Sequence, residues 1–231
     1  MKPSLSTTGD GQVSVIRRLA TGRNLFLVAL VLVVIAAALS IKVVSIEDDT
    51  GKHVFDAEEY ADTYFESVTM PAIMDTAVDL KTVLAAIEED EDKAKEDYGN
   101  SSNPANPYSY PVTLTAVAGE VSEKGDMVAL TVDGLSSEYT VQLQIVPGTQ
   151  TALRDVTGFV DLNQFLNQVE YLQVSLEFNY KAEELVLIPF LEDHPADTLA
   201  GQTLQITGAF IDNSANVITV IAVSIEVVQG A

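Results

Sequence analysis

The stretch of sequence that decides the fold is residues 147–180, PGTQTALRDVTGFVDLNQFLNQVEYLQVSLEFNY. It begins with a turn and continues through the charged pair Arg154 and Asp155. A short apolar strand and an amphipathic helix rich in amide side chains follow. Three strand-like segments precede this stretch and two follow it, so it is expected to cover or feed a small sheet.

The helix in this stretch has recognisable start and stop signals. Asp161 is expected to cap it, with Gln164 at the third helical position. Pro189 should end it, because proline lacks the N–H that continues the helical ladder. We therefore expect one helix over residues 161–188, whose apolar side is formed by Leu162, Phe165, Leu166, Val169, Leu172 and Leu176.

The flanking segments alternate apolar and polar residues, as strands do. The first three are joined by short turns, which favours an antiparallel meander. The last segment is nearly all Val, Ile and Ala, which is typical of a strand buried on both faces. The predicted strands cover residues 112–118, 128–132, 139–146, 204–211 and 217–227.

Three strands, a helix and two strands is the chain order of an oligonucleotide/oligosaccharide-binding (OB) barrel. Closure would also protect the edges of so short a sheet. We therefore expect an α+β protein in which residues 100–231 form an OB-like, five-stranded antiparallel barrel with a helix between its third and fourth strands. An open sheet covered by a helix is the alternative.

A helical segment is expected over residues 56–99, before the barrel. Asp56 is expected to cap its first helix, and Pro71 should interrupt the pattern before a second helix begins. That helix ends in the acidic run 88–97, EEDEDKAKED. The run lacks the spacing and the central glycine of a calcium loop, so we expect a solvated helical surface.

The N-terminal part predicts a membrane anchor. Residues 1–24 read as a disordered cytoplasmic tail, and residues 25–41 carry no charge, so a transmembrane helix is expected over 25–44 with a linker over 45–55. Arginines precede the apolar run and acids follow it, which places the N-terminus in the cytoplasm and the remainder in the periplasm or outside the cell. A cleaved signal peptide and a buried core helix are the alternatives.

Composition excludes several classes of function. Cysteine is absent, which removes disulfides, thiolate catalysis and thiolate metal sites. After residue 42 there are seven Lys and Arg against 33 acids, a charge of about −26. A field of that sign repels phosphodiester backbones, so nucleic acid is not an expected partner. No cofactor or metal site is predicted.

Several segments resemble, in order and spacing, the uncharacterised bacterial family of predicted periplasmic lipoproteins, domain of unknown function 2291. They are FDAEEY at 55–60, AVDL at 77–80, KEDYG at 95–99, TALRD at 151–155, FLNQVEY at 165–171 and GAFIDN at 208–213. The resemblance covers nearly everything from residue 55 onward, and LRD followed by F-x-N-Q is its most specific part.

The resemblance implies an OB-type fold and a non-enzymatic periplasmic accessory, encoded beside ATP-driven sugar uptake transporters. Two departures stand out. The family's lipidated cysteine is expected near Ile41 and is absent here, so we expect the apolar helix to hold the protein to the cytoplasmic membrane. Gln150 stands where relatives tend to have glycine.

Six residues are candidates for ligand binding: Arg154, Asp155, Asn163, Asn167, Gln168 and Tyr171. Arg154 is the only arginine after residue 23, so it either clamps a carboxylate, such as that of Asp155 or Glu170, or anchors a ligand through its planar fork. Amide side chains suit sugar hydroxyls, but they also satisfy loop carbonyls.

The sequence thus favours a membrane-anchored accessory that binds a small sugar or components of a sugar transporter. The alternatives are a hydrolase of envelope polysaccharide with paired carboxylates, and a purely structural envelope protein.

Overall fold

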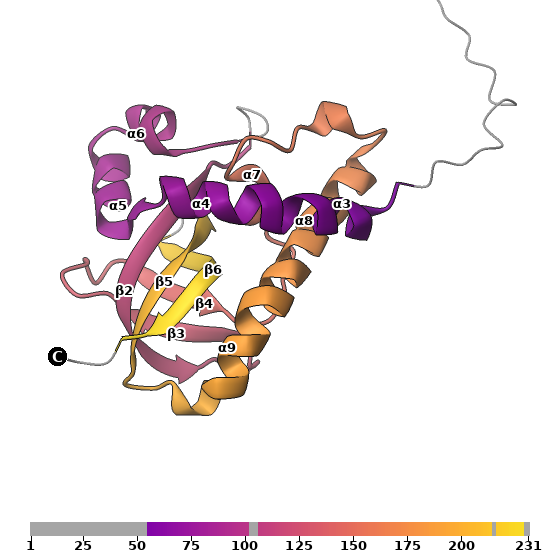
Figure 1. The fold of residues 1–231 in the computed structure, drawn as a ribbon. Coiled ribbons are helices and arrows are strands. Elements are labelled where there is room, and N and C mark those ends of the chain that lie inside the picture. Colours follow the sequence, from indigo (N-terminus) through magenta and orange to yellow (C-terminus); the bar gives the residue numbers. More distant parts are fainter. Residues whose placement is uncertain (1–54, 102–105, 214–215, 229–231) are drawn as a thin grey trace, which may run out of the picture. The chain divides into compact units, whose positions relative to one another are not determined.

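The computed structural model describes residues 55–101, 106–213 and 216–228, and Figure 1 shows a barrel of strands with helices against its outside. Each barrel strand pairs with two neighbours, in the order β2-β3-β4-β6-β5 and back to β2. The short β1 (Val78–Asp79) adds to β2 in parallel. The barrel strands are β2 (Ser109–Val121), β3 (Met127–Thr131), β4 (Thr140–Gln144), β5 (Thr203–Ile211) and β6 (Val217–Val227).

The predicted barrel is confirmed, but the prediction that all its strands are antiparallel is wrong. β4 and β6 run parallel, whereas the other four neighbouring pairs of the ring are antiparallel. The reason is one of parity: strand directions cannot alternate around a closed ring of five, so one pair must be parallel.

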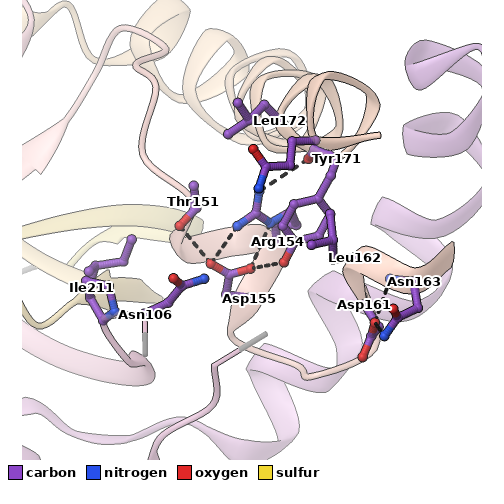
Figure 2. Close-up of a pocket in the computed structure, with 12 residues that line it drawn as sticks. Asn106, Thr151, Arg154, Asp155, Asp161, Leu162, Asn163, Tyr171, Leu172 and Ile211 are labelled. Carbon is purple, nitrogen blue, oxygen red and sulfur yellow. Dashed lines mark hydrogen bonds and ion pairs between the residues drawn. The ribbon is translucent and has the colours of Figure 1, made fainter. Parts of the chain in front are cut away.

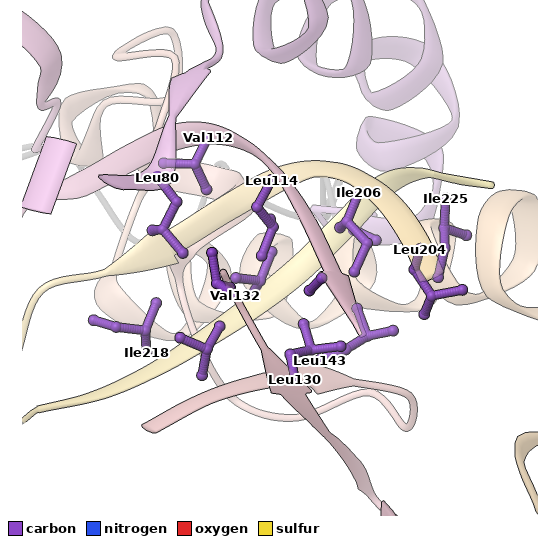
Figure 3. Packing of buried hydrophobic residues seen from close by; sticks show 14 of the residues in the cluster. Leu80, Val112, Leu114, Leu130, Val132, Leu143, Leu204, Ile206, Ile218 and Ile225 are labelled. Carbon is purple, nitrogen blue, oxygen red and sulfur yellow. The ribbon is translucent and has the colours of Figure 1, made fainter. Parts of the chain in front are cut away.

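Two hydrophobic cores lie on opposite sides of the sheet. The inner core fills the barrel, where residues such as Leu114, Leu143 and Ile218 meet (Figure 3). The outer core lies between the barrel wall and the helices and includes Ile221 and Val223 of β6. β6 is therefore buried on both faces, as its composition predicts.

Alternate residues of β6 face the two cores, and a bulge in the β5–β6 ladder shifts this alternation near the end of the strand. The register shifts at Gly208, after which Ile225 returns to the barrel interior. A Cβ atom on Gly208 would lie 2.1 Å from the carbonyl oxygen of Ile221, so only glycine fits here.

The long helix begins later than predicted. Asp161 and Gln164 form a capping box, but it closes only a 3₁₀ turn, Leu162–Gln164. Phe165 and Asn167 are extended, and Asn167 caps α8 (Gln168–Ala182). The predicted apolar side is consequently wrong: Leu166, Val169 and Leu172 are exposed, whereas the buried face carries Tyr171, Val174, Ser175, Phe178, Asn179 and Ala182.

The prolines do not end their helices, contrary to prediction. α8 continues through the π-helical turn η4 (Glu183–Leu187) into α9 (Ile188–Asp193), where Pro189 is the second residue. In the same way α3 (Ala57–Tyr64) continues through η2 (Phe65–Thr69) into α4 (Met70–Thr76), with Pro71 second. A π turn already interrupts the regular ladder, so the missing proline N–H falls where the ladder is already irregular.

The other helices lie in the predicted segments, but the predicted second helix is divided in two, because Asp90 is extended and caps a separate helix. Asp56 caps α3 by accepting from the backbone N–H of Glu59 at 3.1 Å. α5 (Leu80–Glu89) is the predicted second helix, and α6 (Glu91–Tyr98) is its acidic tail, which ends at Gly99. A short 3₁₀ turn, η5 (Ala196–Thr198), leads into β5.

The predicted tail, anchor and most of the linker, residues 1–54, lie outside the described residues. Within the ranges that are described, no helix combines the length and the apolar composition required to cross a bilayer.

Candidate functional site

A cavity of about 530 Å³ lies beside the N-terminal half of α8. Figure 2 shows that its wall is built mainly from the 147–180 stretch, with Asn106 and Ile211 approaching from other parts of the chain. The polar lining is Asn106, Thr151, Arg154, Asp155, Asp161, Asn163 and Gln168, and the other lining residues are Pro107, Leu162, Tyr171, Leu172 and Ile211.

A single helical turn, α7 (Ala152–Asp155), brings the charged pair to this wall. The N–H groups of Arg154 and Asp155 both donate to the carbonyl of Thr151, at 3.1 and 3.0 Å. The chain then turns at Gly158, whose φ of +65° favours glycine. The predicted apolar strand after the charged pair is therefore wrong: residues 156–160 form turns and coil.

Arg154 and Asp155 form a buried, bidentate ion pair. The guanidinium Nε lies 2.7 Å from Asp155 Oδ1, and Nη2 lies 2.9 Å from Oδ2. Both side chains are only 3% exposed. This is the carboxylate clamp that the sequence offered as one of two readings of Arg154, with Asp155 as its partner.

Tyr171 of α8 completes the cluster. Its ring centroid lies 3.6 Å from Arg154 Cζ, and its backbone carbonyl accepts from Arg154 Nη1 at 3.2 Å. Its hydroxyl donates to Asp155 Oδ1 at 3.0 Å, while the Thr151 hydroxyl donates to Oδ2 at 2.7 Å. Figure 2 shows these groups converging on the carboxylate.

Arg154 and Asp155 differ in the hydrogen-bonding capacity that remains for a ligand. Asp155 accepts four hydrogen bonds, which fill the acceptor capacity of a carboxylate. Arg154 has five N–H donors, of which three are used within the described part of the chain. The cluster can therefore donate to a ligand but has little capacity left to accept.

The structure brings five of the six predicted residues to the cavity wall. Besides the cluster, these are Asn163, whose Nδ2 donates to Asp161 Oδ1 at 2.7 Å, and the exposed Gln168. Asn167 is not among the lining residues. Its Oδ1 accepts from the backbone N–H groups of Val169 and Glu170 at 2.9 and 3.1 Å, so its side chain caps α8.

Sequence reasoning missed the rest of the lining. Thr151 stands four residues before Asp155 and could have been found from that spacing. The sequence predicts Leu172 on the apolar side of the helix and Ile211 at a strand end, so neither is expected at a cavity. Nothing local to Asn106 signals its place here, because it approaches from a loop about 50 residues away. No cluster of metal-ligating side chains occurs in the ranges that the structure covers.

A family model described as a predicted periplasmic lipoprotein, domain of unknown function 2291, matches residues 29–226. The structure is also similar to the crystal structure of an OB-fold protein from Thermotoga maritima, with a TM-score of 0.61. That match has 16% sequence identity and covers 75% of this chain and 99% of the other, so it shows the fold alone. No protein with a curated description matches the chain.

Proposed function

Because this chain belongs to the family of predicted periplasmic lipoproteins, domain of unknown function 2291, we propose that it is a non-enzymatic accessory of a solute uptake system at the cell envelope. Its cavity binds a small, neutral, hydroxyl-rich ligand of the size of a monosaccharide. The family assignment supports the envelope location, and the cavity supports the ligand.

The observation that carries this proposal is the chemistry of the cavity wall. Its volume of about 530 Å³ is in the range of small-molecule sites. Arg154 offers unused donors there, but Asp155 neutralises its charge, which favours a neutral oxygen over an anion. Asn163 and Gln168 add amide groups that both donate and accept.

The same wall argues against the alternative of a hydrolase. Glycoside hydrolysis needs one carboxyl group that gives up a proton and another that acts as base or nucleophile. Asp155 is held by four hydrogen bonds. Asp161, the other acid of the wall, accepts from the backbone and the side chain of Asn163, both at 2.7 Å.

The surface beside the cavity supports an accessory role. Leu166, just before α8, and Val169 and Leu172, within its first turns, are exposed by 85%, 63% and 56%. Such an exposed apolar segment is typical of a protein contact. We propose that it faces a transporter component, which places ligand and partner at adjoining surfaces.

Anchoring is assigned to residues 25–44. The family is described as lipoprotein, but no cysteine occurs at any of the 231 positions, so this sequence offers no thiol for a lipid. The uncharged run has the length and the flanking charges of a single membrane-spanning helix with its N-terminus in the cytoplasm.

Isothermal titration of the full chain in detergent with a panel of neutral pentoses and hexoses tests the ligand. We expect saturable heat with at least one sugar, and a loss of at least tenfold in affinity for Asn163→Ala and Gln168→Ala. Asn167→Ala is the matched control, because it removes an amide outside the cavity and should leave the affinity unchanged.

Silence with every sugar would contradict the proposed ligand. Release of reducing ends from envelope polysaccharide, abolished by Asp161→Asn, would instead favour the hydrolase.

A further inference from the structure

The outer edge of β6 changes its surroundings halfway along the strand. On one side β6 pairs with β5 over residues 221–227. On the other side β4 pairs only with residues 217–220. From residue 221 onward, the edge that faces away from β5 therefore has no strand partner within the described part of the chain.

The backbone groups at this edge can be assigned from the ladder. The N–H of Val228 donates to the carbonyl of Thr203 at 2.8 Å, so it points toward the β5 side. Directions alternate along an antiparallel pair, so the N–H and C=O groups of Val227 and Ile225 point away from β5. None of the described residues supplies a backbone partner for them outside the ladder.

A groove of about 500 Å³ runs along the same edge. Five consecutive residues of β6, 223–227, line it, which identifies a strand edge, because a strand face would contribute only alternate residues. The opposite wall is apolar and comes from η4, α9 and the start of α4. It is formed by Met70, Leu185, Val186, Pro189 and Phe190.

The charge of the groove selects its occupant. Asp193, Glu226 and His194 are its titratable lining residues, and neither Lys nor Arg is among them. The whole chain carries −22, so a second copy of this chain would be repelled. A cationic segment would be attracted and would find carboxylates at the groove.

We propose that this groove binds an extended basic segment of a partner protein, which adds as a strand to the free edge of β6. Backbone hydrogen bonds to Ile225 and Val227 would hold the segment. Its alternate side chains would pack on Pro189 and Phe190, and the others, Lys or Arg, would reach Asp193 and Glu226. This site is separate from the cavity beside α8 and does not depend on its ligand.

Fluorescence anisotropy of the labelled peptide Lys-Val-Lys-Val-Lys-Val-Lys with the full chain in detergent tests the proposal. About 0.3 M salt suppresses unspecific attraction. We expect saturable binding that falls at least tenfold when every peptide amide is N-methylated, because the methylated peptide keeps its charge but loses its N–H donors. A Glu-Val peptide of the same length should not bind.

Variants locate the site. Val227→Pro removes an N–H that points away from β5 and should weaken binding at least tenfold, whereas Val227→Ala should not. Melting followed by circular dichroism shows whether the proline variant folds; if it does not, the comparison of methylated and unmethylated peptides on the wild-type chain decides.

Equal binding of the methylated peptide, or no binding of either, would overturn the proposal. Two other occupants would also overturn it. A second copy would appear as a dimer that Val227→Pro dissociates, and the chain's own residues 45–54 would appear as peptide binding that is gained only on their deletion.

Discussion

Arg154 is held in a buried ion pair and also lines the cavity beside α8. Its guanidinium is buried against Asp155 and Tyr171, so the pair cannot be broken without leaving a charge in a place that excludes water. At the same time it lines the cavity, and two of its five N–H donors have no partner among the described residues. From the sequence, Arg154 either pairs with a carboxylate or anchors a ligand. The structure shows the pairing with Asp155, and the remaining N–H donors are compatible with a ligand as well.

Removing Arg154 should therefore destabilise the fold. Arg154→Met is expected to lower the free energy of unfolding by about 3–5 kcal/mol, because Asp155 is left buried and unpaired. Urea denaturation followed by circular dichroism measures this, since the chain has no tryptophan to report by fluorescence.

The double variant Arg154→Met with Asp155→Leu is the control. It removes both charges and should recover a large part of the loss. If the double variant loses as much stability as the single variants Arg154→Met and Asp155→Leu together, the two side chains are not energetically coupled.

Among the helices and strands, the start of α8 shows how two correct local signals can give a wrong helix. Asp161 does cap a turn, yet a second cap at Asn167 lies six residues later, and the chain uses both. The sequence alone does not say which cap starts the long helix, because each has an acceptor at the right place. Choosing the wrong one rotated the predicted helix and turned Val169 and Leu172 inward.

The helical segment from α3 to α4, which packs on α8, could also be predicted only in part. Proline predicts the end of a helix, whereas η2 and η4 carry both helices past Pro71 and Pro189. The π turns depend on tertiary packing, which no local pattern reveals.

A substitution of Asn167 tests whether this residue caps α8. Asn167→Ala removes the cap of α8 and should cost about 1 kcal/mol of unfolding free energy. Asn163→Ala changes an exposed amide that caps nothing and should cost less than about 0.5 kcal/mol. Thermal melting of both variants checks this, and equal losses would show that Asn167 is not the working cap.

Acidic residues meet where α3 packs on α8. Burial raises the pKa of Glu177, and the charges of Glu58, Asp56 and Asp62 raise it further, although Lys181 opposes them. A pKa that is higher in the folded than in the unfolded state contributes stability below the unfolded value, and this contribution is lost as pH rises through the folded pKa. At pH 7 the ionised Glu177 therefore destabilises the fold.

Glu177→Gln should accordingly stabilise the protein at pH 7, by a few tenths of a kcal/mol, roughly the size of like-charge effects on helix surfaces. Urea titrations at pH 7 and pH 3 check this on one variant. At pH 3 the wild-type carboxyl is protonated, so the difference between the two proteins should vanish. A gain of equal size at both pH values would point to packing rather than charge.

For the whole molecule, the order of strands and helix along the chain was enough to predict the barrel. The sequence segments from residue 55 onward were enough to predict the family. Five strands in a closed ring require a parallel pair, which could have been derived in advance, whereas its position between β4 and β6 comes from the structure. The cavity could not, because Asn106 and Ile211 reach it only through the closure of the barrel.

The distribution of charge along the chain predicts how the protein is oriented in the membrane. Residues 1–42 hold five Lys and Arg and one acid, and the rest of the chain is strongly acidic. A basic flank stays in the cytoplasm, so residues 25–44 should span the membrane once and leave the barrel outside. Because the sequence has no cysteine, labelled fatty acid should not be incorporated.

Carbonate washing of membranes should leave the full chain in the pellet, and deletion of residues 1–44 should release the barrel in soluble form. Protease added to intact spheroplasts should digest the C-terminal part. Replacing Arg17, Arg18 and Arg23 by Glu removes the charge bias without shortening the apolar run, and should reduce the digested fraction. Full protection of the wild-type barrel, or release of the full chain by carbonate, would contradict a spanning anchor.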